Sequence, residues 1–529
     1  MFNHLLLDID AGTIDWSRAQ FALTAIYHWL FVPLTLGLAV IMGIVETKYY
    51  CTKDDFWKEA AKFWQKLFGV NFAMGVATGI ILEFEFGTNW SNYSWFVGDI
   101  FGAPLAVEGI VAFFMESTFV AVMYFGWKKV SPGFHLASTW LTGLGATISA
   151  WWILVANAWM QYPVGCEFNP DTMRNEMVSF AEVALSPFAV GKFCHTVTSA
   201  WIIGAIFCVG VCCWYLMKKR HTKLAIESMK IGAGVGLVAA LLAGATGHKS
   251  GMDVAEVQPM KLAAMEALYN GGTEQGLTAI AWVNPFAQPD YQNEAEAPLK
   301  LDIPFGLSIM ATNDPHGFVP GINDILNGYT TPDGKVEPSV DEKIERGKKA
   351  IEALANYRAA KFESSDDGTA AAYNLEILKE NMKYFGYGYI KDKNDIVPFI
   401  PINFWAFRVM VGLGCLFILF FAVILAVTYR WPKFLFGKRD ITALPAWHYW
   451  VAIILIPLGY IGSECGWLVA EFGRQPWTIQ DMLPTWAAVS DLQASNVAIT
   501  FFLFLILFTT MLAVEINILL KQIKKGPAL

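Results

Sequence analysis

The sequence predicts an all-α polytopic membrane protein with nine transmembrane helices and a long extracytoplasmic insert between helices 6 and 7. The first reason is composition, because 55% of the 529 residues are hydrophobic and only 16% are charged. The second is that apolar runs near the bilayer-crossing length of about 20 residues recur along the chain. Nine such runs occur, at about 19–45, 66–90, 105–127, 135–160, 188–217, 224–247, 402–429, 446–470 and 497–520.

These runs divide the chain into three parts. We expect transmembrane helices 1–6 in residues 1–250, a polar insert in 251–400, and transmembrane helices 7–9 in 401–529. The insert mixes helical stretches with breaks rich in proline and glycine. It is too long for a simple connection, and loops of that size are usually functional or disordered.

The positively charged residues of the short loops set the expected orientation. Lys and Arg cluster after spans 1, 3, 5 and 7 and in the tail after span 9, whereas the opposite short loops carry only Arg174 and Arg474. Basic loops stay in the cytoplasm. We therefore expect an outer N-terminus and insert and a cytoplasmic C-terminus. The start of the chain lacks the basic region of a cleavable signal peptide.

Two of the eight histidines lie deep inside the apolar runs. His28 is about ten residues into span 1, which is about 15 Å along a helix. His195 is about eight residues into span 5, so both rings are expected in the outer half of the membrane. An ionisable side chain in hydrocarbon is costly and usually functional. Metal binding is one interpretation, and a helix-packing histidine bonded to a neighbour is the other.

Spans 7 and 8 carry further candidates at the same level. Met410 is a potential thioether ligand, although a lone methionine is nearly always core packing. Arg408 needs an anion, for which a haem propionate is one candidate. Glu471 shares a helix face with Trp467, and three roles are open to it: iron ligand, proton carrier, or interfacial charge paired with Arg474. Spacing alone favours the last.

Span 3 carries two carboxyl groups, Glu108 and Glu116. On a regular α-helix they would lie about 80° apart. Each is costly if charged and unpaired, which suits a proton relay; packing of protonated carboxyl groups is the alternative. From the residues alone, a redox haem protein is favoured over a secondary transporter, since the chain lacks the repeats typical of transporters. A haem protein that transfers electrons without reducing oxygen is a second alternative.

Longer motifs add a family resemblance. They are Gly473-Arg-Gln-Pro-Trp477, Ser17-Arg-Ala-Gln-Phe-Ala-Leu-Thr-Ala-Ile-Tyr-His28, Phe86-Gly-Thr-Asn-Trp90, Gly102-Ala-Pro-Leu-Ala-Val-Glu108, Glu116-Ser-Thr-Phe, Trp152-Ile-Leu-Val-Ala-Asn157 and Lys261-Leu-Ala-Ala-Met-Glu266. Along essentially all nine spans the chain resembles subunit I of the cytochrome bd-type quinol oxidases. The middle of the insert, about 285–390, is only loosely similar.

The resemblance implies a low-spin haem b, a high-spin haem b and a haem d, with haem b in place of haem d in some relatives. It implies His195 and Met410 as axial ligands of the low-spin haem, and His28 and Glu471 as ligands in the high-spin pair. It leaves open which haem each of those two holds.

The remaining site residues also take roles from the resemblance. Arg408 resembles a propionate partner and Trp467 an aromatic residue between haems, and we expect Arg474 to contribute to cofactor binding. Glu108 and Glu116 resemble the proton path, and Lys261 and Glu266 the quinol site, for ubiquinol or menaquinol.

The implied enzyme is a terminal respiratory oxidase. It would oxidise quinol at the outer face, reduce dioxygen to water, and generate a proton motive force by vectorial proton uptake and release without pumping. Expected partners are a second membrane subunit, a small single-span subunit, quinol, dioxygen and the lipid of a bacterial plasma (inner) membrane. We expect no nucleic-acid partner.

Overall fold

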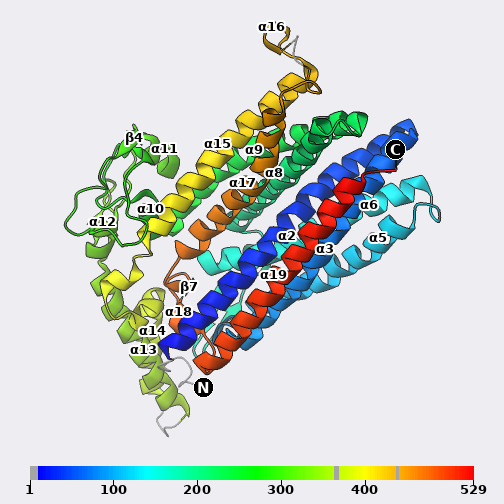
Figure 1. Ribbon diagram of the computed structural model, residues 1–529. Helices are drawn as coiled ribbons and strands as arrows, with labels where there is room; N and C mark the ends of the chain where they lie inside the picture. The colour runs from blue at the N-terminus through cyan, green and yellow to red at the C-terminus, as the bar shows by residue number, and fades with distance from the viewer. Residues whose placement is uncertain (1–9, 363–367, 437–439, 529) are drawn as a thin grey trace.

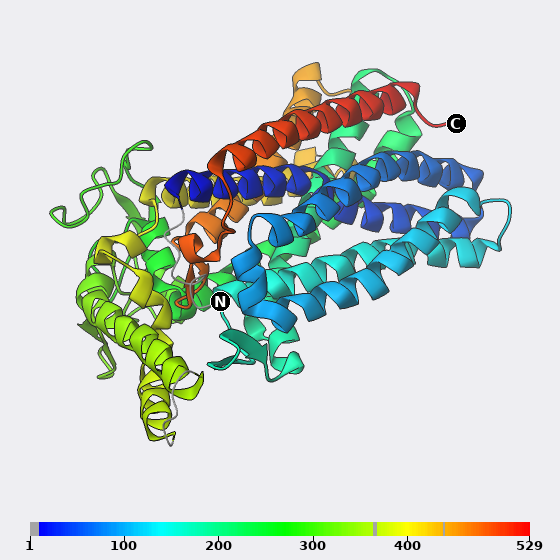
Figure 2. The same ribbon diagram turned by 90° about the horizontal axis from the view of Figure 1, so that it is seen from below.

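The computed structural model describes residues 10–362, 368–436 and 440–528. In these ranges nine helical spans are long and apolar enough to cross a membrane, which confirms the predicted number. Figures 1 and 2 show them running side by side in one bundle. The spans are α2 (Ala11–Thr52), α3 (Asp55–Thr88), α4 to α5 (Ser91–Phe125), α6 (Pro132–Gln161), α7 with α8 (Phe180–Ala184 and Pro187–Met217), α9 (Thr222–Val257), α15 (Ile400–Tyr429), α17 (Ala446–Phe472) and α19 (Ala494–Lys525).

Several helices extend beyond the predicted apolar runs. α3 begins at Asp55, where the apolar run suggested residue 66, and α9 continues to Val257 where the run ended near 247. Polar residues continue these helices beyond the apolar runs, and capping side chains fix where the helices start. The Asp54 side chain accepts a hydrogen bond from the Phe56 amide, and Ser131 caps α6 just before a proline in its first turn.

The third span is not a uniform α-helix. α4 (Ser91–Val107) is followed by a π-helical segment, η1 (Glu108–Phe113), and then by α5 (Phe114–Phe125). Each turn of a π-helix takes in more residues than an α-helical turn, and such segments are frequent at functional sites. Near its start, the span bends at Gly98, whose φ of +45° favours glycine.

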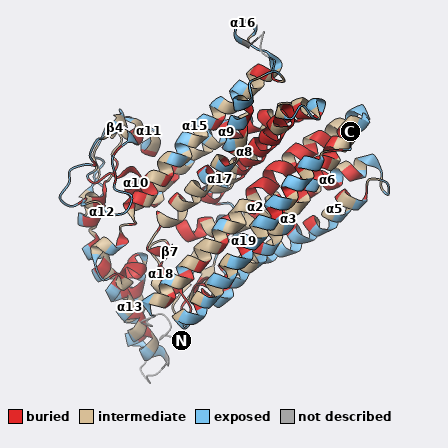
Figure 3. Cartoon of the chain, viewed as in Figure 1, coloured by how far each residue is buried: buried red, intermediate tan, exposed pale blue. Residues whose placement is uncertain are grey.

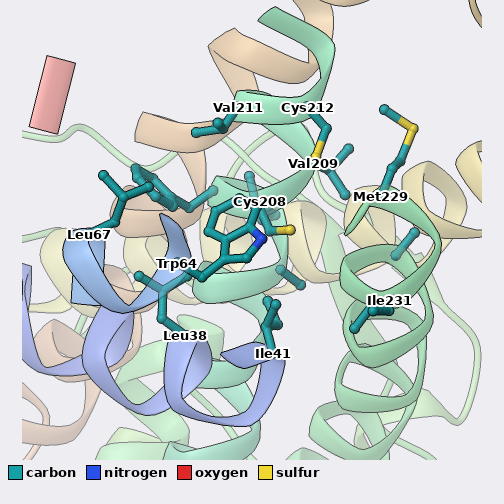
Figure 4. Packing of buried hydrophobic residues seen from close by; sticks show 14 of the residues in the cluster. Leu38, Ile41, Trp64, Leu67, Cys208, Val209, Val211, Cys212, Met229 and Ile231 are labelled. Atoms are coloured by element: carbon teal, nitrogen blue, oxygen red, sulfur yellow. The ribbon is translucent and has the colours of Figure 1, made fainter. Parts of the chain in front are cut away.

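The core of the bundle is built around α8, which is the most buried span (Figure 3). α2 crosses it at direct backbone contact, since a Cβ added to Gly37 would lie 2.6 Å from the Gly204 Cα. Small residues at crossings allow such close packing in membranes. Around this crossing, apolar side chains such as Ile41, Trp64 and Cys208 form a continuous cluster (Figure 4).

Residues 258–399 lie between α9 and α15. Their helices are α10 (Pro259–Glu266), α11 (Gly306–Thr312), α12 (Ile322–Asn327), α13 (Val340–Phe362), α14 (Thr369–Asn381), η2 (Met382–Tyr389) and η3 (Lys393–Ile396). In both ribbon views this segment lies at the same end of the bundle as the start of α2, and the C-terminal end of α19 lies at the other (Figures 1 and 2). α13, α14 and η2 pack through a small apolar core of their own that includes Leu354 and Phe385.

The remaining elements are short. Two single-turn helices are α16 (Lys433–Phe436) and α18 (Thr485–Ala488). Four antiparallel strand pairs are β1 (Cys166–Asn169) with β2 (Arg174–Met177), β3 (Leu277–Ile280) with β4 (Leu301–Ile303), β5 (Tyr329–Thr330) with β6 (Val336–Glu337), and β7 (Trp477–Ile479) with β8 (Leu483–Pro484). The last pair follows α17 directly and closes one end of the cavity described below.

Candidate functional site

A cavity of about 680 Å³ lies among α2, α3, the α4–η1–α5 span, α6 and α17. Its walls are mainly aromatic and aliphatic, with a few charged groups, as is usual for cofactor pockets. The predicted site residues that line it are His28, Glu108, Glu116, Trp467, Glu471 and Arg474. His195, Met410, Arg408, Lys261 and Glu266 are not part of this lining. Lys261 nevertheless lies beside it, since its ammonium donates to the carbonyl of Ala470, the residue before Glu471.

His28 enters the cavity from α2 with one ring nitrogen already bonded. Its Nδ1 lies 2.9 Å from the Thr78 hydroxyl on α3. Among the described residues the other nitrogen, Nε2, has no hydrogen-bond partner. A histidine held through Nδ1 with a free Nε2 is the usual arrangement of a metal-ligating imidazole.

Glu471 lies at the end of α17, where charged and polar side chains surround it. Its Oε2 is 2.6 Å from the Arg474 guanidinium, and its Oε1 accepts a hydrogen bond of 3.1 Å from the Asn157 amide. The Lys192 ammonium lies 5.6 Å from the centre of the Trp467 ring, next to this pair. The expected pairing with Arg474 is present, and each carboxylate oxygen retains a lone pair for a further ligand.

Glu108 and Glu116 line the same cavity, and their separation differs from the prediction. The value of about 80° assumed a regular α-helix, but the π-helical η1 inserts about one residue between them. The eight steps from Glu108 to Glu116 then rotate about the helix axis only as far as seven α-helical residues do. The two carboxyl groups therefore lie only about 20° apart around the span. The Ser149 hydroxyl donates a hydrogen bond of 2.5 Å to Glu108, whose second oxygen is buried without a partner among the described residues.

His195 on α8 and Met410 on α15 lie outside the cavity lining, and their helices pack against α9 and α17. The His195 Nδ1 lies 3.1 Å from the Ala243 carbonyl oxygen and 3.2 Å from the Thr246 hydroxyl, both on α9. Its Nε2 has no hydrogen-bond partner in the described part of the chain. Met410 faces α17, because a Cβ added to Gly466 would lie 3.1 Å from its Sδ. Each therefore retains a donor atom with a free lone pair.

Lys261 is buried on α10 and has no carboxylate partner within bonding distance among the residues that the structure describes. Its ammonium donates to the side-chain oxygens of Gln161 and Gln258, at 2.8 and 2.7 Å, and to the Ala470 carbonyl at 3.0 Å. Burial, reinforced by the positive charge of Lys192, holds the pKa of Lys261 well below its usual range. Such a lysine can lose its proton more readily than one in water.

Glu266, at the end of the same helix, pairs with Arg408. Its Oε2 lies 2.8 Å from the guanidinium and 3.3 Å from the Thr278 amide, and Arg408 also donates to the Met265 carbonyl. Burial raises the pKa of Glu266 to about 7, although the Arg408 charge opposes this. The sequence suggested a propionate as the anion for Arg408, whereas the structure places Glu266 there. The Arg408 Nε has no partner in the described part of the chain.

Within the described ranges, no group of three or more His, Cys, Asp or Glu side chains is arranged to hold a metal ion. Single donors on separate helices suit a metal whose other ligands come from a cofactor, as in haem proteins, where the protein supplies one or two axial ligands.

Sequence reasoning assigned no role to several residues around the predicted site. Arg18, Glu83 and Glu464 all line the cavity. Thr78 and Thr246 were also missed. A usable signal existed for both, because each stands in an Ala-Thr-Gly tripeptide about 50 residues after a buried histidine.

Comparison with known proteins places this geometry in a family. The family model described as cytochrome bd terminal oxidase subunit I matches residues 16–527. The chain is 40% identical to cytochrome bd-II ubiquinol oxidase subunit 1 of Escherichia coli (strain K12), over 97% of each protein. It is 34% identical to cytochrome bd ubiquinol oxidase subunit 1 of Bacillus subtilis (strain 168), over 96% of this chain and 93% of that protein.

A solved structure has the same fold. The bd oxidase from Geobacillus thermodenitrificans matches with a TM-score of 0.75 and 21% identity, over 97% of this chain and 99% of that one. With a family match along nearly the whole sequence, the chain belongs to the cytochrome bd terminal oxidase subunit I family.

Proposed function

We propose that this chain carries the haems and the quinol site of a respiratory oxidase that generates a proton motive force. As a bacterial membrane protein of its family, it is a quinol:oxygen oxidoreductase with haem cofactors and a subunit II partner. The observation that supports the haem sites best is the pair of histidines, His28 and His195. Both are held through Nδ1 by a neighbouring helix and keep Nε2 free.

The donor sets fit three haems. His195 and Met410 would hold a low-spin haem b between α8 and α15. His28 and Glu471, which line one cavity, would serve a high-spin haem b and a haem d, or a haem b in its place. When bound, haem would supply one-electron transfer and the binding and reduction of dioxygen. Arg474 would place positive charge beside the Glu471 carboxylate.

Glu108 and Glu116 are the proposed proton carriers to the cavity. Both line it, and the π-helical segment turns them toward one side of their span. The unpartnered oxygen of Glu108 can receive a proton while Ser149 holds the other oxygen. Protons would enter from the cytoplasm along this span. Trp467, also in the lining, would lie between the haems.

Quinol oxidation is proposed at α10. A quinol releases two protons when it loses two electrons, so a base must stand nearby. Glu266, with a pKa of about 7, would take a proton near neutral pH, and Lys261 would bind the quinol oxygen. The names of the relatives specify ubiquinol for the E. coli protein and, at 24% identity, menaquinol for a putative B. subtilis oxidase. Either substrate suits these residues.

Charge separation follows from where protons are released and taken up. We place residues 258–399 and the N-terminus outside and the C-terminus in the cytoplasm of a bacterial inner membrane. Protons from quinol would then leave outside while those consumed with oxygen come from inside, with no pump. A small single-span subunit is proposed in addition to subunit II.

A proteoliposome experiment tests this function. The purified complex, given quinol and oxygen, is expected to consume oxygen and acidify the compartment facing residues 258–399. Oxygen consumption without that acidification would contradict the proposed proton route. Loss of oxygen consumption with quinol-reducible haem retained would favour the alternative of an electron-transfer protein that does not reduce oxygen.

A further inference from the structure

Two helix pairs hold the two buried histidines in the same way. His28 on α2 faces Thr78 and Gly79 on α3, and His195 on α8 faces Thr246 and Gly247 on α9. In both pairs the threonine and glycine end an Ala-Thr-Gly tripeptide, and that tripeptide occurs nowhere else in the sequence. Each threonine follows its histidine by about the same distance, 50 residues in one pair and 51 in the other.

The threonine fixes which ring nitrogen carries the proton. The Thr78 hydroxyl donates to the Met74 or Gly75 carbonyl, at 3.0 and 3.1 Å, and the Thr246 hydroxyl donates to the Leu242 carbonyl at 2.8 Å. A hydroxyl has a single proton, so a threonine that donates it to a carbonyl accepts a hydrogen bond from the imidazole. At His195 the Ala243 carbonyl, 3.1 Å from Nδ1, requires the same direction, because a carbonyl oxygen only accepts. Nδ1 must then carry the proton, which leaves the lone pair on Nε2.

The glycine fixes how close the ring comes to the neighbouring helix. A Cβ at Gly79 would lie 3.1 Å from the His28 Cε1, and a Cβ at Gly247 would lie 3.2 Å from the His195 Cε1. Both distances are shorter than ordinary van der Waals contact between carbon atoms. Because Cε1 joins the two ring nitrogens, a side chain larger than glycine would displace Nε2 and pull Nδ1 away from the threonine.

We propose that Thr78–Gly79 and Thr246–Gly247 are positioning pairs that set the tautomer and the depth of the two haem-ligating histidines. The inference rests on the proposed haem ligation by His28 and His195. It assigns a role to four residues that are not themselves haem ligands. Thr78 and Gly79 contact His28 and not His195, whereas Thr246 and Gly247 contact His195 and not His28. Each pair would therefore affect only the haem that its own histidine holds. Loss of such an outer-shell partner typically costs about tenfold to a hundredfold in metal-site affinity or activity.

The test uses the complete oxidase, purified from cells. Its measurements are haem content, the reduced-minus-oxidised spectrum and haem midpoint potentials of the assembled fraction. Variants at the pairs are Thr78→Val, Thr246→Val, Gly79→Ala and Gly247→Ala, with Thr78→Ser and Thr246→Ser as conservative partners. Matched controls are Gly87→Ala on α3 and Gly234→Ala on α9, where an added Cβ meets no atom within 4 Å.

Variants at 246 and 247 are expected to weaken or shift the low-spin haem signal alone, and those at 78 and 79 the high-spin signals alone. The serine variants and the two control glycine variants should keep the wild-type spectrum. If the valine and alanine variants match the controls while His28→Ala and His195→Ala lose their haem signals, the positioning pairs are refuted and the haem ligation stands. If the histidine variants also keep every signal, the ligand assignment itself fails.

Discussion

Glu471 and Arg474 form an ion pair one helical turn apart, with 2.6 Å between the carboxylate Oε2 and the guanidinium. Arg474 is 8% exposed and Glu471 28%, so water screens the pair weakly. Arg474 also donates a hydrogen bond of 2.7 Å to the Thr478 carbonyl, which ties the end of α17 to β7. Both side chains line the cavity, so the pair fixes a carboxylate at the site where we propose haem ligation.

Replacing Arg474 by glutamine should destabilise the protein more than replacing it by lysine. Glutamine removes the guanidinium that neutralises the partly exposed Glu471 carboxylate and leaves the more distant Lys192 ammonium beside it. Breaking a fully buried pair costs about 3 kcal/mol or more in soluble proteins, which is an upper bound here. Lysine keeps the charge and loses only the paired geometry. Thermal unfolding of the detergent-solubilised complex, with haem content recorded, measures both. Equal melting points for the two variants would show that the charge is not what stabilises this end of α17.

His195→Ala and Met410→Leu should remove or convert the low-spin haem spectrum while the protein still assembles. Each change removes one donor atom from a region outside the main cavity, so the high-spin signals should be retained. Absorption spectra of the purified complex, compared with its haem content, report the outcome. A low-spin signal of wild-type shape in either variant would remove that residue from the ligand set.

The sequence predicts the number of spans and the positions of His28 and Glu471 along their helices. It can do so because the spans and these positions depend on local sequence patterns. Apolar runs predict the spans, and the number of residues from the start of a helix predicts the level of each proposed ligand. The separation of Glu108 from Glu116 could not be predicted in this way, since it depends on a π-helical segment. Such a segment depends on packing against neighbouring helices, which periodicity does not report.

Partners across helices are a second limit of the sequence. Arg408 was recognised as needing an anion, but nothing in its own span shows that Glu266 lies 2.8 Å away. Lys261 and Glu266 were predicted as a pair, and they share α10. In the structure they contact different groups, because residues five apart on a helix point about 140° apart.

Glu108→Gln should slow turnover with haem content retained. Glutamine keeps the hydrogen bond with Ser149 but cannot carry a proton, and a positioned proton-transfer group typically contributes at least about a hundredfold. Oxygen consumption with quinol, normalised to haem, is the measurement. Ser149→Ala serves as the comparison, since it removes the hydrogen bond and keeps the carboxyl group. Wild-type turnover in Glu108→Gln would exclude Glu108 from the proton path.

Lys261→Ala should raise the apparent KM for quinol several-fold and leave haem binding nearly unchanged. Its ammonium is the cation of α10, and alanine leaves the oxygens of Gln161, Gln258 and Ala470 without that donor. Steady-state kinetics and pigment spectra of the same preparation separate the two effects. Lys335→Ala is a suitable control, because Lys335 is an exposed residue of the insert. An unchanged KM together with lost haem would show that Lys261 does not belong to the quinol site.

Glu266 should give quinol oxidation an acid limb near pH 7. Burial raises the pKa of Glu266 to about 7, so below that pH the carboxyl is protonated and cannot take a proton from quinol. kcat/KM should therefore fall by about tenfold for each pH unit below 7 and level off above it.

The raised pKa of Glu266 also affects stability. Because the folded state holds this proton up to about pH 7, the contribution of Glu266 to the free energy of unfolding decreases as pH rises from about 4.5 to about 7. Glu266→Gln should lower activity and remove both dependences, and a glutamine variant that keeps the acid limb would assign the titration to another group.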